Sequence, residues 1–131
     1  MTSRLVIPVL AGVLAAGSAA ASPPAGLHPI TVAPPSVDGV PKEVAVLADL
    51  PTVKIVAITL RTGTTLSEHT APVPVTIEAA HGAATLTVAG ATTPLAQGAF
   101  VVLDANTLHA VTPVDTAPVT VLVHHHKVGV Q

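Results

Sequence analysis

The chain has 131 residues, half of them hydrophobic, and a formal net charge of -2 at pH 7. This length suits one domain, and a weak negative charge without any Lys/Arg cluster predicts no nucleic-acid partner. Cysteine is absent, which excludes disulfides, thiolate metal sites and a cysteine nucleophile.

The composition favours β-structure. The chain has one Phe, Phe100, and no Trp or Tyr, so the core must be built from Val, Leu, Ile and Ala. Valine and threonine are plentiful, and both are β-branched residues that suit a pleated surface. Thirteen prolines, spread along the chain, argue against long helices.

Residues 1–21 have the pattern of a signal peptide. Arg4 supplies a positive start, residues 5–16 are apolar, and small residues end in an A-x-A pattern at residues 19–21. A membrane anchor is the alternative, but it needs about 20 continuous apolar residues. We therefore expect a cleaved signal, a periplasmic or secreted protein, and no stable membrane span after signal removal.

Residues 22–41 form a Pro/Gly-rich leader. Its composition predicts an extended, flexible segment without a packed core. His28 lies in this leader and is interpreted as a solvated loop residue. The folded domain is expected to cover residues 42–131.

The first strands follow the leader. Residues 43–50 suit either a short helical turn or an edge strand, and Pro51 ends the segment. Residues 53–60, VKIVAITL, predict a strand with apolar residues on both faces. Such a strand is buried on both sides or covered by a second subunit, so a homodimer is one expectation.

The rest of the chain alternates short apolar segments with turn residues. Residues 66–69 lead into Pro72 and Pro74, a pair that suits an edge or entry segment. Strands are predicted at residues 75–80, 84–88, 94–95, 99–103, 108–111 and 118–124. Many short strands at regular spacing indicate an all-β sandwich or barrel. Apolar residues expected to line or fill its interior are Ile77, Ala79, Leu86, Val88, Phe100, Val102 and Leu103.

Two glycine-to-histidine spacings carry a family resemblance. Gly63 is followed by five residues and His69; Gly98 is followed by five residues, the turn 104–106, two more residues and His109. With the phrase HTAPVPVTIEAAHG, these spacings resemble the two motifs of the cupin superfamily over about residues 50–126. The resemblance implies a small, single-domain, RmlC-like jelly-roll β-barrel. Asn106 stands where the family has glycine, and asparagine tolerates the left-handed conformation.

The resemblance also implies a metal site with a degenerate motif. Cupin metal sites use two histidines and a carboxylate from the first motif and one histidine from the second. His69 and His109 match two of these positions, whereas the others fall on Ala71 and on Val75 or Thr76. A divalent transition metal (Fe, Mn, Ni or Zn) would meet an incomplete ligand set, so we expect none to be tightly bound.

The candidate site lies between His69 and His109. We predict that these two histidines bind a small molecule of unknown identity in the barrel, and they are the first candidate metal ligands, with His81 as an alternative third. His81 is in phase with Ile77 and Ala79, so it is predicted to face inward as a third ligand-binding residue. Glu78 is expected to face outward, and no catalytic residue is identified.

A run of three histidines, residues 124–126, lies near the end of the chain. On a strand, His124 and His126 share one face and His125 takes the other. The run is interpreted as a polar strand end, with adventitious binding of Zn, Ni or Cu as the alternative.

Three functions remain open. The preferred hypothesis is an exported cupin-domain protein that binds a small molecule. The alternatives are a metal-dependent cupin enzyme, an oxygenase or isomerase with an incomplete ligand set, and an envelope structural or interaction protein that works through its outer surface. No G-x-S-x-G, P-loop or G-x-G-x-x-G motif supports another enzyme class.

Overall fold

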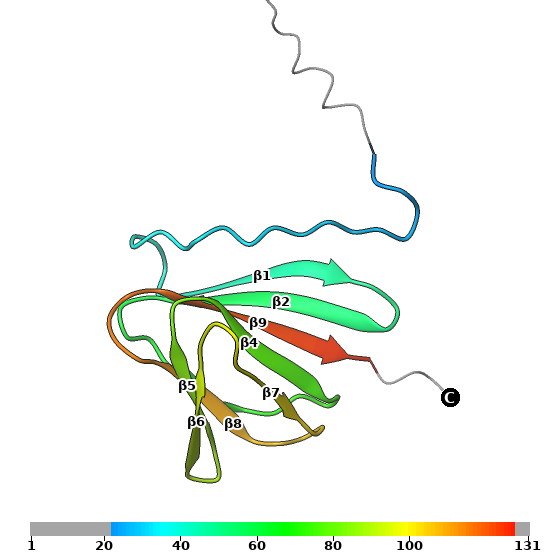
Figure 1. Cartoon of the computed structure of the whole chain (residues 1–131). Coiled ribbons are helices and arrows are strands. Elements are labelled where there is room, and N and C mark those ends of the chain that lie inside the picture. The colour runs from blue at the N-terminus through cyan, green and yellow to red at the C-terminus, as the bar shows by residue number, and fades with distance from the viewer. Residues whose placement is uncertain (1–21, 128–131) are drawn as a thin grey trace, which may run out of the picture. The chain divides into compact units, whose positions relative to one another are not determined.

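The structure is a computed structural model that describes residues 22–127 (Figure 1). The predicted signal peptide, residues 1–21, and the last four residues lie outside this range. Residues from Thr31 onward belong to one compact unit, and the residues before Thr31 are assigned to a separate one. No helix long and apolar enough to cross a membrane is found in the described part of the chain.

The described residues form nine strands and no helix. The strands are β1 (Lys42–Asp49), β2 (Val53–Leu60), β3 (Leu66–His69), β4 (Val75–His81), β5 (Ala84–Val88), β6 (Ala91–Leu95), β7 (Phe100–Leu103), β8 (His109–Pro113) and β9 (Val119–His126). The all-β expectation is confirmed. The ambiguous segment near residue 43 is a strand, β1, and not a helical turn.

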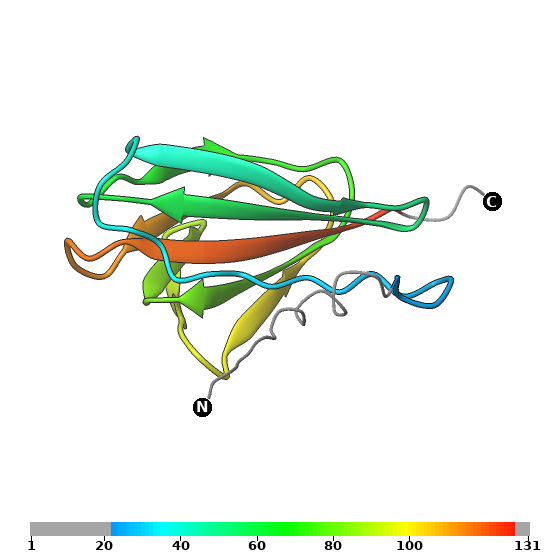
Figure 2. The same ribbon diagram turned by 90° about the horizontal axis from the view of Figure 1, so that it is seen from above.

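The strands form two antiparallel sheets (Figures 1 and 2). The five-stranded sheet has the order β1-β2-β9-β4-β7, and the four-stranded sheet has the order β3-β8-β5-β6. Strand β9 lies between β2 and β4, although it is far from both in sequence. Because partners come from distant parts of the chain, no single stretch can form this architecture alone.

The core lies between the sheets and is aliphatic. Alternation along each strand sends every second side chain inward. Full burial of one Val, Leu or Ile side chain contributes roughly 1.5–3 kcal/mol. The largest fully buried side chains are Leu60, Ile77, Leu95, Val75, Val111, Val119 and Val121.

Most, but not all, of the predicted interior residues are inside. Leu103 belongs to the core with Ile77, Ala79 and Leu86, and Val88 packs against it. Phe100 and Val102 are instead 62% and 64% exposed, so their predicted place in the interior is wrong. The cause is the register of β7 on β4: Leu103 pairs with the inward Val75, which turns Val102 and Phe100 outward.

The prediction of burial on both faces holds in the middle of β2. Three successive residues, Val56, Ala57 and Ile58, are at most 9% exposed. Val56 and Ile58 belong to the core between the sheets, whereas Ala57 alternates to the outer face. Burial of both faces therefore occurs within a single chain.

Residues 31–41, here called the strap, lie over the outer face of the five-stranded sheet (Figure 2). The ring Nε2 of His81 on β4 donates to the Val32 carbonyl at 2.8 Å. Arg61, the residue directly after β2, binds the other end of the strap through hydrogen bonds to its backbone carbonyls. Thr120 of β9 lies between these two anchors and is 2% exposed. The sequence predicted a flexible leader here, and this part of it is instead tied to the sheet.

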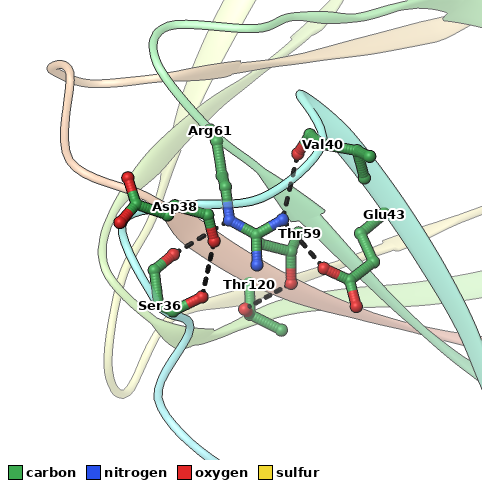
Figure 3. A network of polar contacts seen from close by, with 7 residues as sticks. All are labelled: Ser36, Asp38, Val40, Glu43, Thr59, Arg61 and Thr120. Carbon is green, nitrogen blue, oxygen red and sulfur yellow. Dashed lines mark hydrogen bonds and ion pairs between the residues drawn. The ribbon is translucent and has the colours of Figure 1, made fainter.

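Arg61 is the main anchor of the strap (Figure 3). Its Nε donates to the Ser36 carbonyl at 2.9 Å, and Nη1 donates to the Val40 carbonyl at 2.9 Å and to Glu43 Oε1 at 2.8 Å. The Arg61 side chain is 6% exposed, against 54% for Glu43. Gly39 has φ +150°, and a Cβ there would lie 2.5 Å from Arg61 Cζ. The strap therefore needs glycine at this position to pass over the guanidinium.

Candidate functional site

One end of the barrel collects four ionisable side chains. Strand β3 ends at His69 and β8 begins at His109, and these two residues are cross-strand partners. In the five-stranded sheet, β2 begins beside the end of β9, and Lys54 pairs with His125. We call this group, His69, His109, His125 and Lys54, the mouth.

The two predicted site histidines meet at the mouth. The ring centroids of His69 and His109 are 4.3 Å apart, and the ring planes are tilted by 55°. His109 is only 2% exposed, whereas His69 is half-buried. The spacing seen in the sequence therefore corresponds to a real contact, made by pairing of β3 with β8.

Both rings are oriented by the backbone in the same way. Nδ1 of His69 lies 2.8 Å from the Ser67 carbonyl, and Nδ1 of His109 lies 2.8 Å from the Thr107 carbonyl. A carbonyl only accepts, so Nδ1 carries the proton and donates in each ring. In the neutral form each Nε2 therefore keeps a lone pair for an external partner.

The surroundings of His109 favour its neutral form. Burial lowers the pKa of His109, since the charged ring loses hydration. The hydrogen bond to the Thr107 carbonyl opposes this effect, and the neighbouring His69 lowers the pKa further. At pH 7 the His109 ring is a neutral acceptor at Nε2.

His125 and Lys54 are site residues that the sequence analysis did not select. Val119, Val121 and Val123 of β9 are core residues, so the two-residue period sends His125 to the same side. Burial lowers the pKa of His125; a backbone hydrogen bond with Lys54 opposes this effect, and the charges of Lys54, His126 and His69 add to the lowering. In the sequence, the alternating valines at residues 119, 121 and 123 are in phase with His125 and indicate that it faces inward.

The other two histidines of the run face outward, as expected from alternation. His124 Nε2 lies 3.3 Å from Glu78 Oε2, and His126 Nε2 lies 2.7 Å from Thr76 Oγ1. Glu78 is thus on the outer face, where it was predicted. Strand β9 continues through His126, so all three histidines are held in the sheet.

His81 is not brought to the mouth. It is the last residue of β4, whereas the mouth lies at the first residues of that strand. A register irregularity between Ala79 and His81 breaks the period, and His81 pairs with Thr120 on the outer face. Its ring binds the strap at Val32. The predicted inward orientation is therefore wrong, because a β-bulge shifts the phase.

The residues present do not fit the four-ligand metal site of cupins. Val75 is 2% exposed and belongs to the core, and Ala71 packs against it. Neither side chain can bind a metal. Within residues 22–127, no group of three or more His, Cys, Asp or Glu residues is placed to hold a metal ion. The same part of the chain contains no ligand-sized pocket.

Comparisons with known proteins give the fold. No family model matches the sequence, and no curated protein does. Among solved structures, a cupin superfamily protein from Desulfitobacterium hafniense matches with a TM-score of 0.58 and 16% identity, over 71% of this chain and 94% of that one. The Cupin_2 domain of an XRE family transcriptional regulator from Enterobacter cloacae matches with a TM-score of 0.60 and 20% identity, over 66% and 97%.

A third match supports the same assignment. An RmlC-like cupin protein from Desulfovibrio desulfuricans has a TM-score of 0.56 and 23% identity, over 67% of this chain and 86% of that one. Together with the two antiparallel sheets, these matches show that the chain has the cupin jelly-roll fold. The fold implied by the two glycine-to-histidine spacings is confirmed. Because one fold can host varied activities, the cupin fold alone does not assign a function to this chain.

Proposed function

We propose that this protein is an exported cupin-domain binding protein that holds a small molecule at the mouth, between His69 and His109. The observation that carries the proposal is the shared anchoring of the two rings: each Nδ1 is bound to a backbone carbonyl, and the ring centroids are 4.3 Å apart. Each Nε2 accepts a hydrogen bond when its ring is neutral and donates one when the ring is protonated. Two fixed contact points of this kind orient one small ligand.

Binding is favoured over metal-dependent catalysis by the donor set. A tightly held metal at a non-haem site of this type needs a carboxylate beside its histidines. In the described part of the chain no carboxylate completes a group with His69 and His109. An oxygenase or isomerase would need a further ligand from the substrate or from outside residues 22–127.

The direct test uses residues 22–131, purified without an affinity tag. The parent protein, a His69→Ala/His109→Ala double variant and an outer-face control, His124→Ala, are compared in a small-molecule screen read by thermal shift. We expect ligands that stabilise the parent and the control but not the double variant. Ligands that stabilise all three equally would refute binding at the mouth and favour an outer-surface role.

Metal analysis of the same preparations separates the enzyme alternative. A binding protein of the proposed kind contains Fe, Mn, Ni and Zn well below one atom per chain. A stoichiometric metal that is lost only in the double variant would replace the proposal by a metal-dependent enzyme. The control variant guards against metal bound adventitiously on the outer face by His124 and His126.

Export is supported by the sequence of residues 1–21. The Arg4 start, the apolar run and the A-x-A pattern together suit a cleaved signal and a periplasmic or secreted protein. Expression of the full chain followed by N-terminal sequencing of the extracytoplasmic fraction tests this. A product that retains Met1 in the cytoplasm would contradict export.

A homodimer completes the proposal. The edge strands of the five-stranded sheet, β1 and β7, carry exposed apolar side chains. These are Val44 and Val46, each 56% exposed, on β1, and Phe100 and Val102 on β7. Exposed apolar edges favour association with a second copy. Light scattering on the mature chain tests the dimer, and a monomer at all concentrations would exclude it.

A further inference from the structure

One lysine at the mouth has no ion-pair partner among the described residues. Lys54 on β2 is the register partner of His125 on β9 and of Asp49 on β1. The Asp49 carboxylate is bound by Lys127 Nζ at 2.5 Å, and Lys127 and Lys54 together lower the pKa of Asp49. Lys127 therefore neutralises Asp49, and the positive charge of Lys54 beside His125 is not matched by an ion pair within residues 22–127.

The inward-facing residues around Lys54 add no negative charge. On β4 and β7 the residues that face the mouth are Val75 and Leu103, which are neutral. Glu68 and Asp104 are the nearest acidic residues in sequence, next to His69 and Leu103, and both are exposed to solvent. Among the described residues, no ion pair joins either carboxylate to Lys54 or to a mouth histidine.

The mouth also contains an unsatisfied polar atom. Nδ1 of His125 is buried and makes no hydrogen bond of normal geometry among the described residues, although a backbone contact with Lys54 raises the pKa of this ring. A buried polar group without a full partner is destabilising. A polar ligand or an ordered water at the mouth would remove this cost. His125 therefore belongs to the binding site together with His69 and His109.

From these observations we infer that the ligand held at the mouth is an anion with a carboxylate group, and that protons are taken up when it binds. The inference rests on the proposed function and names the chemical class of its ligand. Lys54 supplies the fixed positive charge, and the histidine Nε2 atoms become donors to the carboxylate oxygens once their rings are protonated. No covalent step is involved.

Proton uptake follows from linkage. Burial holds the pKa of His109 and His125 below the ordinary value of 6.5, so both rings are neutral at pH 7. A carboxylate beside them favours the charged form and raises both pKa values. The anion must therefore bind more tightly as the pH falls, by at most about tenfold per pH unit for each proton taken up.

The experiment compares two probes of nearly equal shape, acetate and acetamide. The mature chain, labelled with ¹⁵N, is titrated with each probe at constant ionic strength, and the imidazole nitrogens are followed by long-range ¹H–¹⁵N spectra at pH 6 and pH 8. We expect acetate to shift the His69, His109 and His125 signals saturably, more tightly at pH 6, and to raise the pKa of His109. Acetamide is expected to leave these signals unchanged.

Two matched variants test the role of the fixed charge. Lys54→Met should weaken acetate binding about two- to fivefold, the effect expected of an exposed ion pair. Lys42→Met removes a lysine of the same charge from the opposite end of β1 and should leave the affinity unchanged. Equal weakening by both variants would mean that only the net charge of the protein matters, and would overturn the inference.

The two proposals fail in different ways. If acetate and acetamide shift the same mouth signals with equal affinity, the mouth binds small molecules but has no preference for an anion, so the inference fails and the proposed function stands. If neither probe shifts any mouth signal up to saturating concentrations, the carboxylate site is overturned. The screen with the His69→Ala/His109→Ala variant then decides the proposed function by itself.

Discussion

Removing the guanidinium of Arg61 should release the strap from the five-stranded sheet. Arg61→Met keeps most of the aliphatic length of the side chain and deletes its donors. Three hydrogen bonds are lost, to the carbonyls of Ser36 and Val40 and to the carboxylate of Glu43. The strap then keeps its bond from His81 to Val32 but loses its second anchor.

The size of the effect follows from the burial of the partners. A hydrogen bond to a charged group contributes about 1.5–3 kcal/mol when the partners are buried. The three acceptors belong to exposed residues, and the Glu43 side chain is 54% exposed, so water satisfies them after the substitution. We therefore expect a loss of about 2–4 kcal/mol in the free energy of unfolding, below the simple sum of three such bonds.

Urea unfolding gives this free energy, and hydrogen exchange shows where the protection is lost. Faster exchange should appear first at the backbone amides of residues 31–41. Arg61→Lys is the matched control, since it keeps the charge but not the planar fork, and it should fall between the parent and Arg61→Met. A loss below about 0.5 kcal/mol, the range of an ordinary surface substitution, would refute the reasoning.

Four further outcomes are expected. Gly39→Ala should destabilise the fold in urea, because its Cβ would lie 2.5 Å from Arg61 Cζ at a φ of +150°; unchanged stability would contradict the close approach. Ile77→Ala should cost about 2–5 kcal/mol by leaving a cavity between the sheets, whereas Val102→Ala on the exposed face of β7 should be near neutral. The free energy of unfolding should fall as the pH drops below 6.5, the ordinary histidine pKa, because the lowered pKa of His109 lets the unfolded state bind more protons than the folded state. His109→Gln should flatten that fall, and a pH profile equal to that of the parent would contradict a lowered pKa at His109. Ala71→His should supply a third imidazole near the histidine pair and increase Ni²⁺ or Zn²⁺ affinity measured by calorimetry, and no gain would show that residue 71 does not face the pair.

The elements that the sequence predicted well are those defined by local chemistry. Val53–Leu60 forms a strand over the full predicted length, because its β-branched residues suit a buried, pleated backbone whatever its partners are. Asn106 has φ +63°, the left-handed conformation expected where the family pattern has glycine. His69 and His109, selected by their spacing from Gly63 and Gly98, are cross-strand partners on β3 and β8.

The misjudged residues depend on contacts that are distant in sequence. Counting alternate residues from Val75 predicts His81 inward, but a bulge before it reverses the face. The size and apolar character of Phe100 predict an inward side chain, but the pairing of β7 with β4 places it outside. The polar neighbours of His125 indicate a solvated strand end, but its partners across the sheet are Lys54 of the mouth and the core residue Val75.

The sequence by itself determined the all-β class, the positions of most strands and the two histidines of the mouth, because period-two patterns, turn residues and fixed spacings are local properties of the chain. Tertiary structure decided the rest. Only the order of strands in the sheets could place Lys54 and His125 beside His69 and His109. Only packing over the outer face could convert residues 31–41 from a flexible leader into a strap, since the carbonyls of Ser36 and Val40 are bound by Arg61 and that of Val32 by His81, both distant in sequence.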